Sequence, residues 1–103
     1  MRAYMGIQEG QTVELPEPRE DGRISVETAL RMRRSHRTYA STPAGLAHIG
    51  QLLWAAYGKT PDEDIAPAGD TVPSAGGIYP LNVYLIAGNV TGLEHGVYRY
   101  ERD

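Results

Sequence analysis

The chain has 103 residues, of which 41% are hydrophobic, with one Trp, seven Tyr, no Phe and no Cys. This length allows one small domain rather than two, and a chain of this size buries only about two-thirds of the surface that its unfolded form exposes. The net charge of -3 and the pI near 5.5 argue against nucleic-acid binding, which usually needs a basic excess. The absence of Cys excludes disulfides and thiolate metal sites.

Residues 1–24 are polar, rich in Pro, Glu and Gly, and show no sustained periodicity. We therefore expect an extended N-terminal arm that is partly disordered or wraps a partner subunit, with the folded domain in residues 25–103. The N-terminus has no apolar h-region, and the longest apolar runs are far shorter than the ~20 residues that span a bilayer. We expect a soluble, cytoplasmic protein without a membrane partner.

The first regular element is a helix predicted over residues 26–34. Ser25 is a good N-cap, and Glu27 lies in the first turn, near the positive end of the helix dipole. The helix should present the segment "RRSHR" at its C-terminal end. One helical face has the spacing i, i+3, i+4, i+7 with Val26, Ala29, Leu30 and Arg33, and its apolar stripe ends where the arginines begin.

A second helix is predicted after Thr42 and Pro43, which suit the N-cap and N1 positions. Gly45 weakens the first turn, and Gly58 is a fitting C′ residue. Its apolar stripe has Leu46, Ile49, Leu53 and Ala56, widened by Leu52.

The remaining sequence predicts a polar loop over 59–72, a turn that could hold one helical turn at 74–78, and two strands. "LNVYLIAGN", residues 81–89, is apolar on both faces, as expected for a central strand. After a turn region, "VYRY" at 97–100 predicts a short strand antiparallel to the first.

The "RRSHR" segment concentrates positive charge. Arg31, Arg33, Arg34 and Arg37 are four of the ten basic residues, with Ser35 and His36 among them. One interpretation is a solvated helix C-terminus whose cations complement the dipole. The other is a phosphate site, because guanidinium groups match phosphate oxygens bidentately and a Ser hydroxyl adds a donor.

The segment "PSAGGIYP" places two glycines between Pro73 and Pro80, just before the apolar strand. It could be a plain turn. It could also be a backbone shelf, because Gly76 and Gly77 have no Cβ and would let a planar ring approach the peptide N–H groups, with Ser74 as a further donor. Neither a GxGxxG fingerprint nor P-loop spacing is present.

Other chemistry finds little support in the sequence. The three histidines are far apart and lack a metal-ligand spacing such as HExxH. "PDED" at 61–64 is most simply a solvated acidic loop, and no Ser-His-Asp arrangement can be argued.

Taken together, "SVETALRMRRSHRTYASTP", "LAHIGQLLWAAYG" and "TVPSAGGIYPLNVYLIAGNVTGLEHGVYRYE" resemble the first part of the nitroreductase-like flavoproteins, closest to the SagB-type dehydrogenase branch, which includes azoline dehydrogenases. The resemblance covers residues 25–102. It implies an α+β fold with helices flanking a mostly antiparallel central sheet, built as an intertwined homodimer with FMN at the interface.

The resemblance also assigns residues. Arg33, Ser35 and Arg37, with Arg34 in the same segment, match positions that hold the FMN phosphate and ribityl chain. The isoalloxazine ring would pack on the start of the "PSAGGIYP" segment, typically from the other subunit. There, Gly77 replaces the Asn of many nitroreductases. That segment has Pro73, Ser74, Ala75, Gly76 and Gly77.

The implied activity is hydride transfer from NAD(P)H through the flavin to an unidentified acceptor, or oxidation of an azoline ring in a peptide. No protein nucleophile is required, and no catalytic residue is assigned in this stretch. Family members are considerably longer, and their downstream half completes the site. Two alternatives therefore stay open, a non-catalytic relative or subunit that needs a partner chain to bind flavin, and a small α+β domain that binds an anion at "RRSHR".

Overall fold

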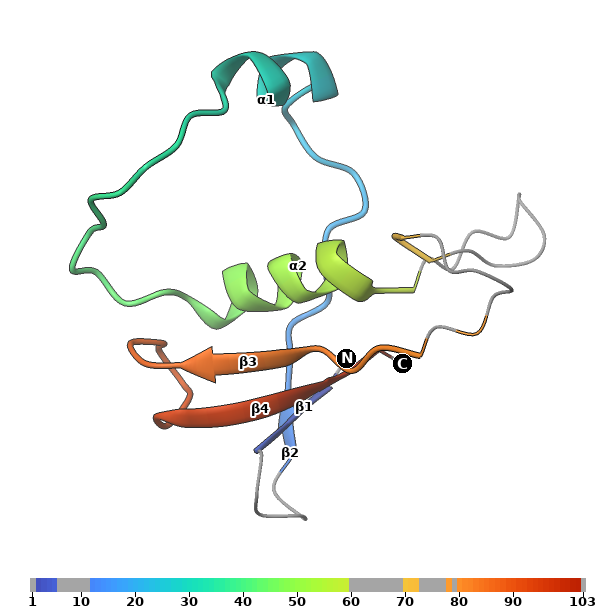
Figure 1. Cartoon of the computed structure of the whole chain (residues 1–103), viewed down its shortest axis with the longest axis vertical. Helices are drawn as coiled ribbons and strands as arrows, with labels where there is room; N and C mark the ends of the chain where they lie inside the picture. The colour runs from blue at the N-terminus through green and yellow to red at the C-terminus, as the bar shows by residue number, and fades with distance from the viewer. Residues whose placement is uncertain (1, 6–11, 60–69, 73–77, 79, 103) are drawn as a thin grey trace.

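The computed structural model describes residues 2–5, 12–59, 70–72, 78 and 80–102. Two helices and a four-stranded antiparallel sheet make up this part of the chain, and one helix lies over the sheet while the other stands apart (Figure 1). No helix in these residues is long and apolar enough to cross a membrane. Two helices and an antiparallel sheet agree with the predicted α+β class, but only one of the two helices lies on the sheet, so the prediction that both flank it is wrong.

The sheet has the strand order β2-β1-β4-β3, and every pairing is antiparallel. Its strands are β1 (Arg2–Met5), β2 (Thr12–Glu14), β3 (Tyr84–Ala87) and β4 (Gly96–Glu101). Residues from the two ends of the chain are neighbours, because Arg2 pairs with Glu101 and Met5 with Tyr98. Strands β1 and β4 accordingly lie side by side in Figure 1.

The expectation for residues 1–24 needs correction. We predicted an extended arm without a regular element, but β1 and β2 pair with each other and β1 joins β4 in the sheet. Leu15, just after β2, is buried in the core. The N-terminal residues that the structure describes therefore belong to the same folded unit as the rest of the chain.

Helix α2 (Leu46–Tyr57) packs on one face of the sheet and forms the core with it. Leu53 is buried as predicted, and Leu46 and Ile49 pack partly buried against the same cluster. Leu52 was expected to widen this face but is 66% exposed, and Ala56 is exposed as well. The cluster consists of Leu15, Leu53, Ala87, Leu93, Tyr98 and Tyr100.

The ends of α2 also differ from the prediction. The helix begins after Gly45, not after Thr42 and Pro43, because Ala44 is already engaged in a bridge to Val90. The Ala44 N–H donates to the Asn89 carbonyl, and the Ala44 carbonyl accepts from the Thr91 N–H. At the other end Gly58 is the C-cap with an extended backbone, φ −90° and ψ 172°, instead of a left-handed C′ residue.

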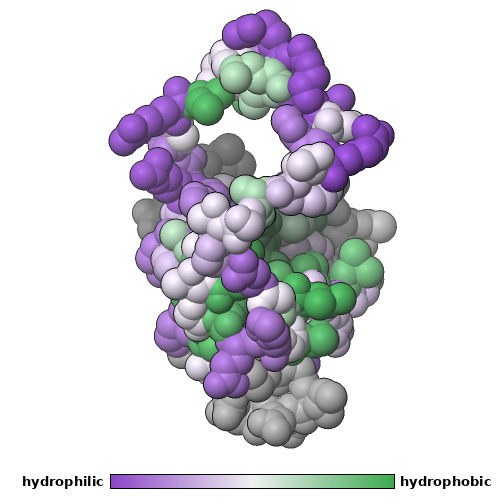
Figure 2. All heavy atoms as spheres, turned by 90° about the vertical axis from the view of Figure 1, so that its left-hand side faces the viewer, coloured by the Kyte–Doolittle hydropathy of each residue, from purple (hydrophilic) through white to green (hydrophobic). Residues whose placement is uncertain are grey.

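Helix α1 (Val26–Met32) begins as predicted at Ser25, whose side chain accepts a hydrogen bond from Thr28 N–H. It ends two residues before the predicted Arg34, because Arg33 adopts φ −59° and ψ 131°. None of its residues is buried. The space-filling view shows α1 and its polar flanks arching away from the rest of the molecule across an opening (Figure 2).

Strand β3 is shorter than the predicted 81–89 and forms an edge of the sheet instead of its centre. Its side chains alternate, so Tyr84 and Ile86 are exposed while Leu85 and Ala87 face α2. The prediction of a central strand is therefore wrong, and the apolar side chains on the outer face of β3 are exposed. The prediction of an antiparallel strand around 97–100 is confirmed by β4, which follows a turn with Gly92 at φ +89°.

Candidate functional site

The predicted phosphate-binding residues follow the C-terminus of α1. Arg33, Arg34, Ser35 and Arg37 are all exposed and have no regular secondary structure. The Arg34 side chain is hydrogen-bonded to the neighbouring backbone, since its Nη1 donates to the carbonyls of Arg31 at 2.9 Å and Arg33 at 2.7 Å. This contact ties the start of the segment to the last turn of the helix.

The side chains of Arg33, Ser35 and Arg37 make no hydrogen bond or ion pair within the described residues. The sequence places no Asp or Glu between positions 28 and 61, so no carboxylate nearby in the chain neutralises these arginines. Their donors are therefore available to an anion. Guanidinium and hydroxyl groups together suit a phosphate.

The second predicted segment, Pro73, Ser74, Ala75, Gly76 and Gly77, lies outside the described residues, and so does most of the predicted helical turn at 74–78. Its flanks are described. Thr71 exchanges hydrogen bonds with Gly58, and Leu81 N–H donates to the Tyr57 hydroxyl. Both flanks are thus held at the C-terminal end of α2.

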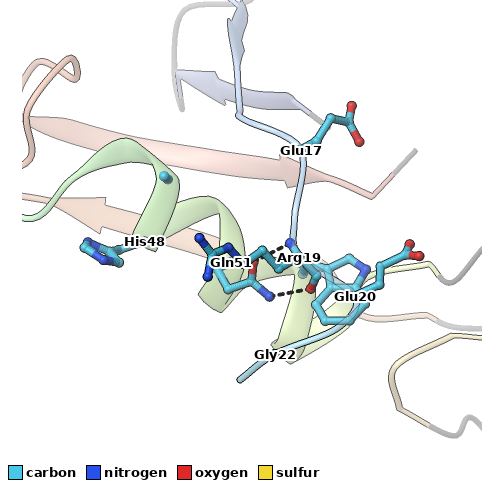
Figure 3. A pocket seen from close by; sticks show the side chains of 8 residues that line it. Glu17, Arg19, Glu20, Gly22, His48 and Gln51 are labelled. Carbon is cyan, nitrogen blue, oxygen red and sulfur yellow. Dashed lines mark hydrogen bonds between the residues drawn. The ribbon is translucent and has the colours of Figure 1, made fainter. Parts of the chain in front are cut away.

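A cleft of about 600 Å³ lies elsewhere, between α2 and the segment that follows β2 (Figure 3). The side-chain amide of Gln51 bridges the Arg19 backbone, accepting from its N–H at 2.7 Å and donating to its carbonyl at 2.9 Å. No predicted site residue lines this cleft. Its lining comprises Glu17, Arg19, Glu20, Gly22, Ala47, His48, Gln51 and Trp54.

Sequence reasoning missed this cleft. Arg19 and Gln51 are 32 positions apart, and their contact forms only when the segment after β2 lies against α2. Its lining side chains are largely exposed, and the cleft is open to solvent. We assign no chemistry to it. In the part of the chain that the structure describes, no group of three or more His, Cys, Asp or Glu could hold a metal ion.

Comparison with known proteins identifies the family to which the sequence is similar. Residues 30–102 match the family described as "Nitroreductase family". The chain belongs to the nitroreductase family. The match spans both predicted cofactor segments, α2 and the strands β3 and β4.

A relative within the curated proteins supports the nitroreductase assignment. "Putative nitroreductase MJ1384" of Methanocaldococcus jannaschii is 42% identical to the chain over 91 residues, which is 88% of this chain and 43% of that protein. This nitroreductase-family chain thus spans less than half the length of the curated relative that it matches. No solved structure matches it.

Proposed function

We propose that this chain contributes to an FMN-dependent oxidoreductase of the nitroreductase type, with the SagB-type dehydrogenases as the nearest branch. The observation that carries the proposal is the family match over residues 30–102, which contains both segments expected to contact the flavin. The side-chain donors of Arg33, Ser35 and Arg37 also support it, because they are exposed, make no hydrogen bond within the described residues and suit a phosphate dianion.

In this proposal Arg33 and Arg37 bind the FMN phosphate, Ser35 donates to the phosphate or ribityl chain, and Arg34 adds positive charge while it fixes the end of α1. Pro73, Ser74, Ala75, Gly76 and Gly77 form the backbone surface for the isoalloxazine ring. Bound FMN would supply two-electron chemistry between NAD(P)H and an acceptor, or an azoline ring of a peptide. The chain itself would bind the ring, orient it and exclude water from it.

The proposed assembly is a homodimer with the flavin at the interface. The described residues leave the arginine segment and α1 exposed, and in this proposal a second chain encloses the cofactor there. The substrate would be a small molecule or a peptide, and the location cytoplasmic.

A second candidate function is a non-catalytic subunit that needs a partner chain to bind flavin. The observation that favours it is α1, which buries none of its residues within the part of the chain that the structure describes.

The visible absorption spectrum of the purified chain, recorded before and after FMN is added and the excess is removed, tests the proposal. Retained flavin absorption supports a cofactor site in this chain, and NADH and NADPH oxidation would then be assayed. A chain that never retains FMN contradicts the proposal and favours the subunit that needs a partner.

We expect Arg33→Ala to weaken FMN binding by about 1.5–3 kcal/mol, the typical value of a hydrogen bond to a charged group. Titration of the flavin by fluorescence quenching measures the change. Arg23→Ala is the matched control, because Arg23 is also an exposed arginine but precedes α1. Equal affinities of Arg33→Ala and the wild type contradict the phosphate role.

A further inference from the structure

Arg102, directly after β4, lies in a partly buried cluster at the C-terminal end of α2. Its guanidinium carbon is 4.4 Å from the centre of the Tyr57 ring, and its Nη2 forms an ion pair with Asp70. The side chains of Arg102 and Asp70 are only 17% and 15% exposed. The ion pair therefore has little solvent screening, and loss of either partner would leave a poorly compensated charge.

The cluster adjoins the chain just before the Pro73–Gly77 segment. Asp70 forms a backbone bridge with Lys59. Next to it, Thr71 N–H donates to the Gly58 carbonyl at 3.0 Å, and Gly58 N–H donates to the Thr71 hydroxyl at 3.0 Å. Residues 70 and 71 are thereby fixed to the two residues that follow α2.

The same cluster reaches the chain just after that segment. Leu81 N–H donates to the Tyr57 hydroxyl at 3.3 Å, and Tyr100 N–H donates to the Val83 carbonyl at 2.9 Å. Tyr57 is itself buried and is the last residue of α2. One side chain thus supports Arg102 with its ring and Leu81 with its hydroxyl.

We propose that Tyr57, Asp70 and Arg102 form an anchor that holds Thr71 and Leu81, one described residue on each side of the proposed flavin-ring segment. They are positioning residues, and this inference rests on the proposed function. Fixing both ends of a segment from one helix end restricts the conformations available between them. A ring-binding surface organised before the flavin arrives costs less binding free energy to order.

The chain offers a matched ion pair as a control. Arg99 and Glu101 form an ion pair at 3.2 Å on β4, but their side chains are 47% and 29% exposed. Exposed pairs of this kind contribute little to stability. Glu101→Gln and Asp70→Asn each remove a carboxylate that forms an ion pair with an arginine. Only Asp70 belongs to the anchor.

The first test measures amide hydrogen exchange by NMR in the full chain without FMN. We expect Asp70→Asn to accelerate exchange at both Thr71 and Leu81 by at least about tenfold, because one partner of a largely buried pair is lost. Tyr57→Phe, which keeps the ring under Arg102, should accelerate exchange at Leu81 alone, and Glu101→Gln at neither. Unchanged exchange in Asp70→Asn, or equal acceleration across the amides of β3 and β4, overturns the anchor.

The second test uses FMN. In Asp70→Asn we expect a weaker affinity and, at saturating FMN, a changed visible spectrum and less quenching of flavin fluorescence, because the ring is less well held. Arg33→Ala should weaken binding without changing the spectrum of the bound flavin. An unaltered bound spectrum in Asp70→Asn overturns the positioning role. If the wild type binds no FMN, the proposed function fails, and the exchange measurement alone decides the anchor.

Discussion

Tyr100 shows how burial of one side chain sets a pH dependence. Its side chain lies in the core, and this burial raises the pKa of the phenol above its ordinary value of 10.0. The folded chain therefore retains a proton that the unfolded chain releases once the pH exceeds about 10. The stabilisation from Tyr100 is complete below that pH and is lost as the pH rises toward the higher pKa of the folded state.

We expect Tyr100→Phe to reduce the decline in the free energy of unfolding above pH ~10, because phenylalanine has no proton to release. Urea unfolding of the variant and the wild type, measured from pH ~8 to ~11, gives the two slopes. The comparison uses slopes, so a constant difference in stability between the two proteins does not affect it. Identical slopes would contradict the role of Tyr100.

Gly58 lies so close to Trp54 that there is no room for a Cβ at this position. A Cβ built at this position would lie 2.4 Å from Trp54 Cδ1 and 2.5 Å from the Trp54 carbonyl oxygen, and the backbone oxygen cannot move aside easily. We expect Gly58→Ala to lower the free energy of unfolding by about 1–3 kcal/mol, as overpacking typically does. Gly88→Ala, where nothing lies within 4 Å of the added Cβ, is the control for chemical denaturation. Similar losses in both variants would contradict the steric explanation.

Among the helices and strands, α2 contributes Leu53 to the core cluster that it shares with the sheet. Leu53 is 7% exposed within the core, whereas the adjacent Leu52 points outward. We expect Leu53→Ala to cost about 2–5 kcal/mol of unfolding free energy, the range for buried large-to-small substitutions. Leu52→Ala should change it by less than about 0.5 kcal/mol. Urea denaturation of both variants measures the difference, and equal costs would show that α2 is oriented otherwise.

The elements that could be predicted from sequence are those with local signals. The Ser25 cap and the apolar spacing of α2 placed both helices, and the apolar run placed β3. The start of α2 could not be predicted, because the backbone of Ala44 is bound to Asn89 and Thr91 far along the chain. The strands β1 and β2 were missed for the same reason, since the partner of β1 is β4 at the other end of the sequence.

Over the whole molecule, one part of the candidate site could be predicted from the sequence and another could not. The arginine segment was predictable because a run of like charges after a helix is visible in the sequence, and the structure leaves Arg33 and Arg37 exposed. The anchor of Tyr57, Asp70 and Arg102 was not, because it joins a helix end, a loop and the residue after a strand. Such a cluster exists only after the sheet has formed.

The outer face of β3 and β4 is largely exposed in the part of the chain that the structure describes. Ile86 on β3 is 82% exposed, and its partner Val97 on β4 and nearby Tyr84 are exposed too. Adjacent apolar side chains on an edge strand favour association between chains. We therefore expect the isolated chain to associate increasingly as its concentration rises.

We expect Ile86→Lys to reduce this association, because a lysine on an edge strand opposes pairing with another chain and places a charge within the apolar face. Sedimentation velocity over a series of concentrations measures the change. Leu52→Lys is the matched control, since it adds the same charge at an exposed leucine on α2, away from this face. If Leu52→Lys reduces association as much as Ile86→Lys, net charge explains the effect, and the outer face of the sheet is not the contact surface.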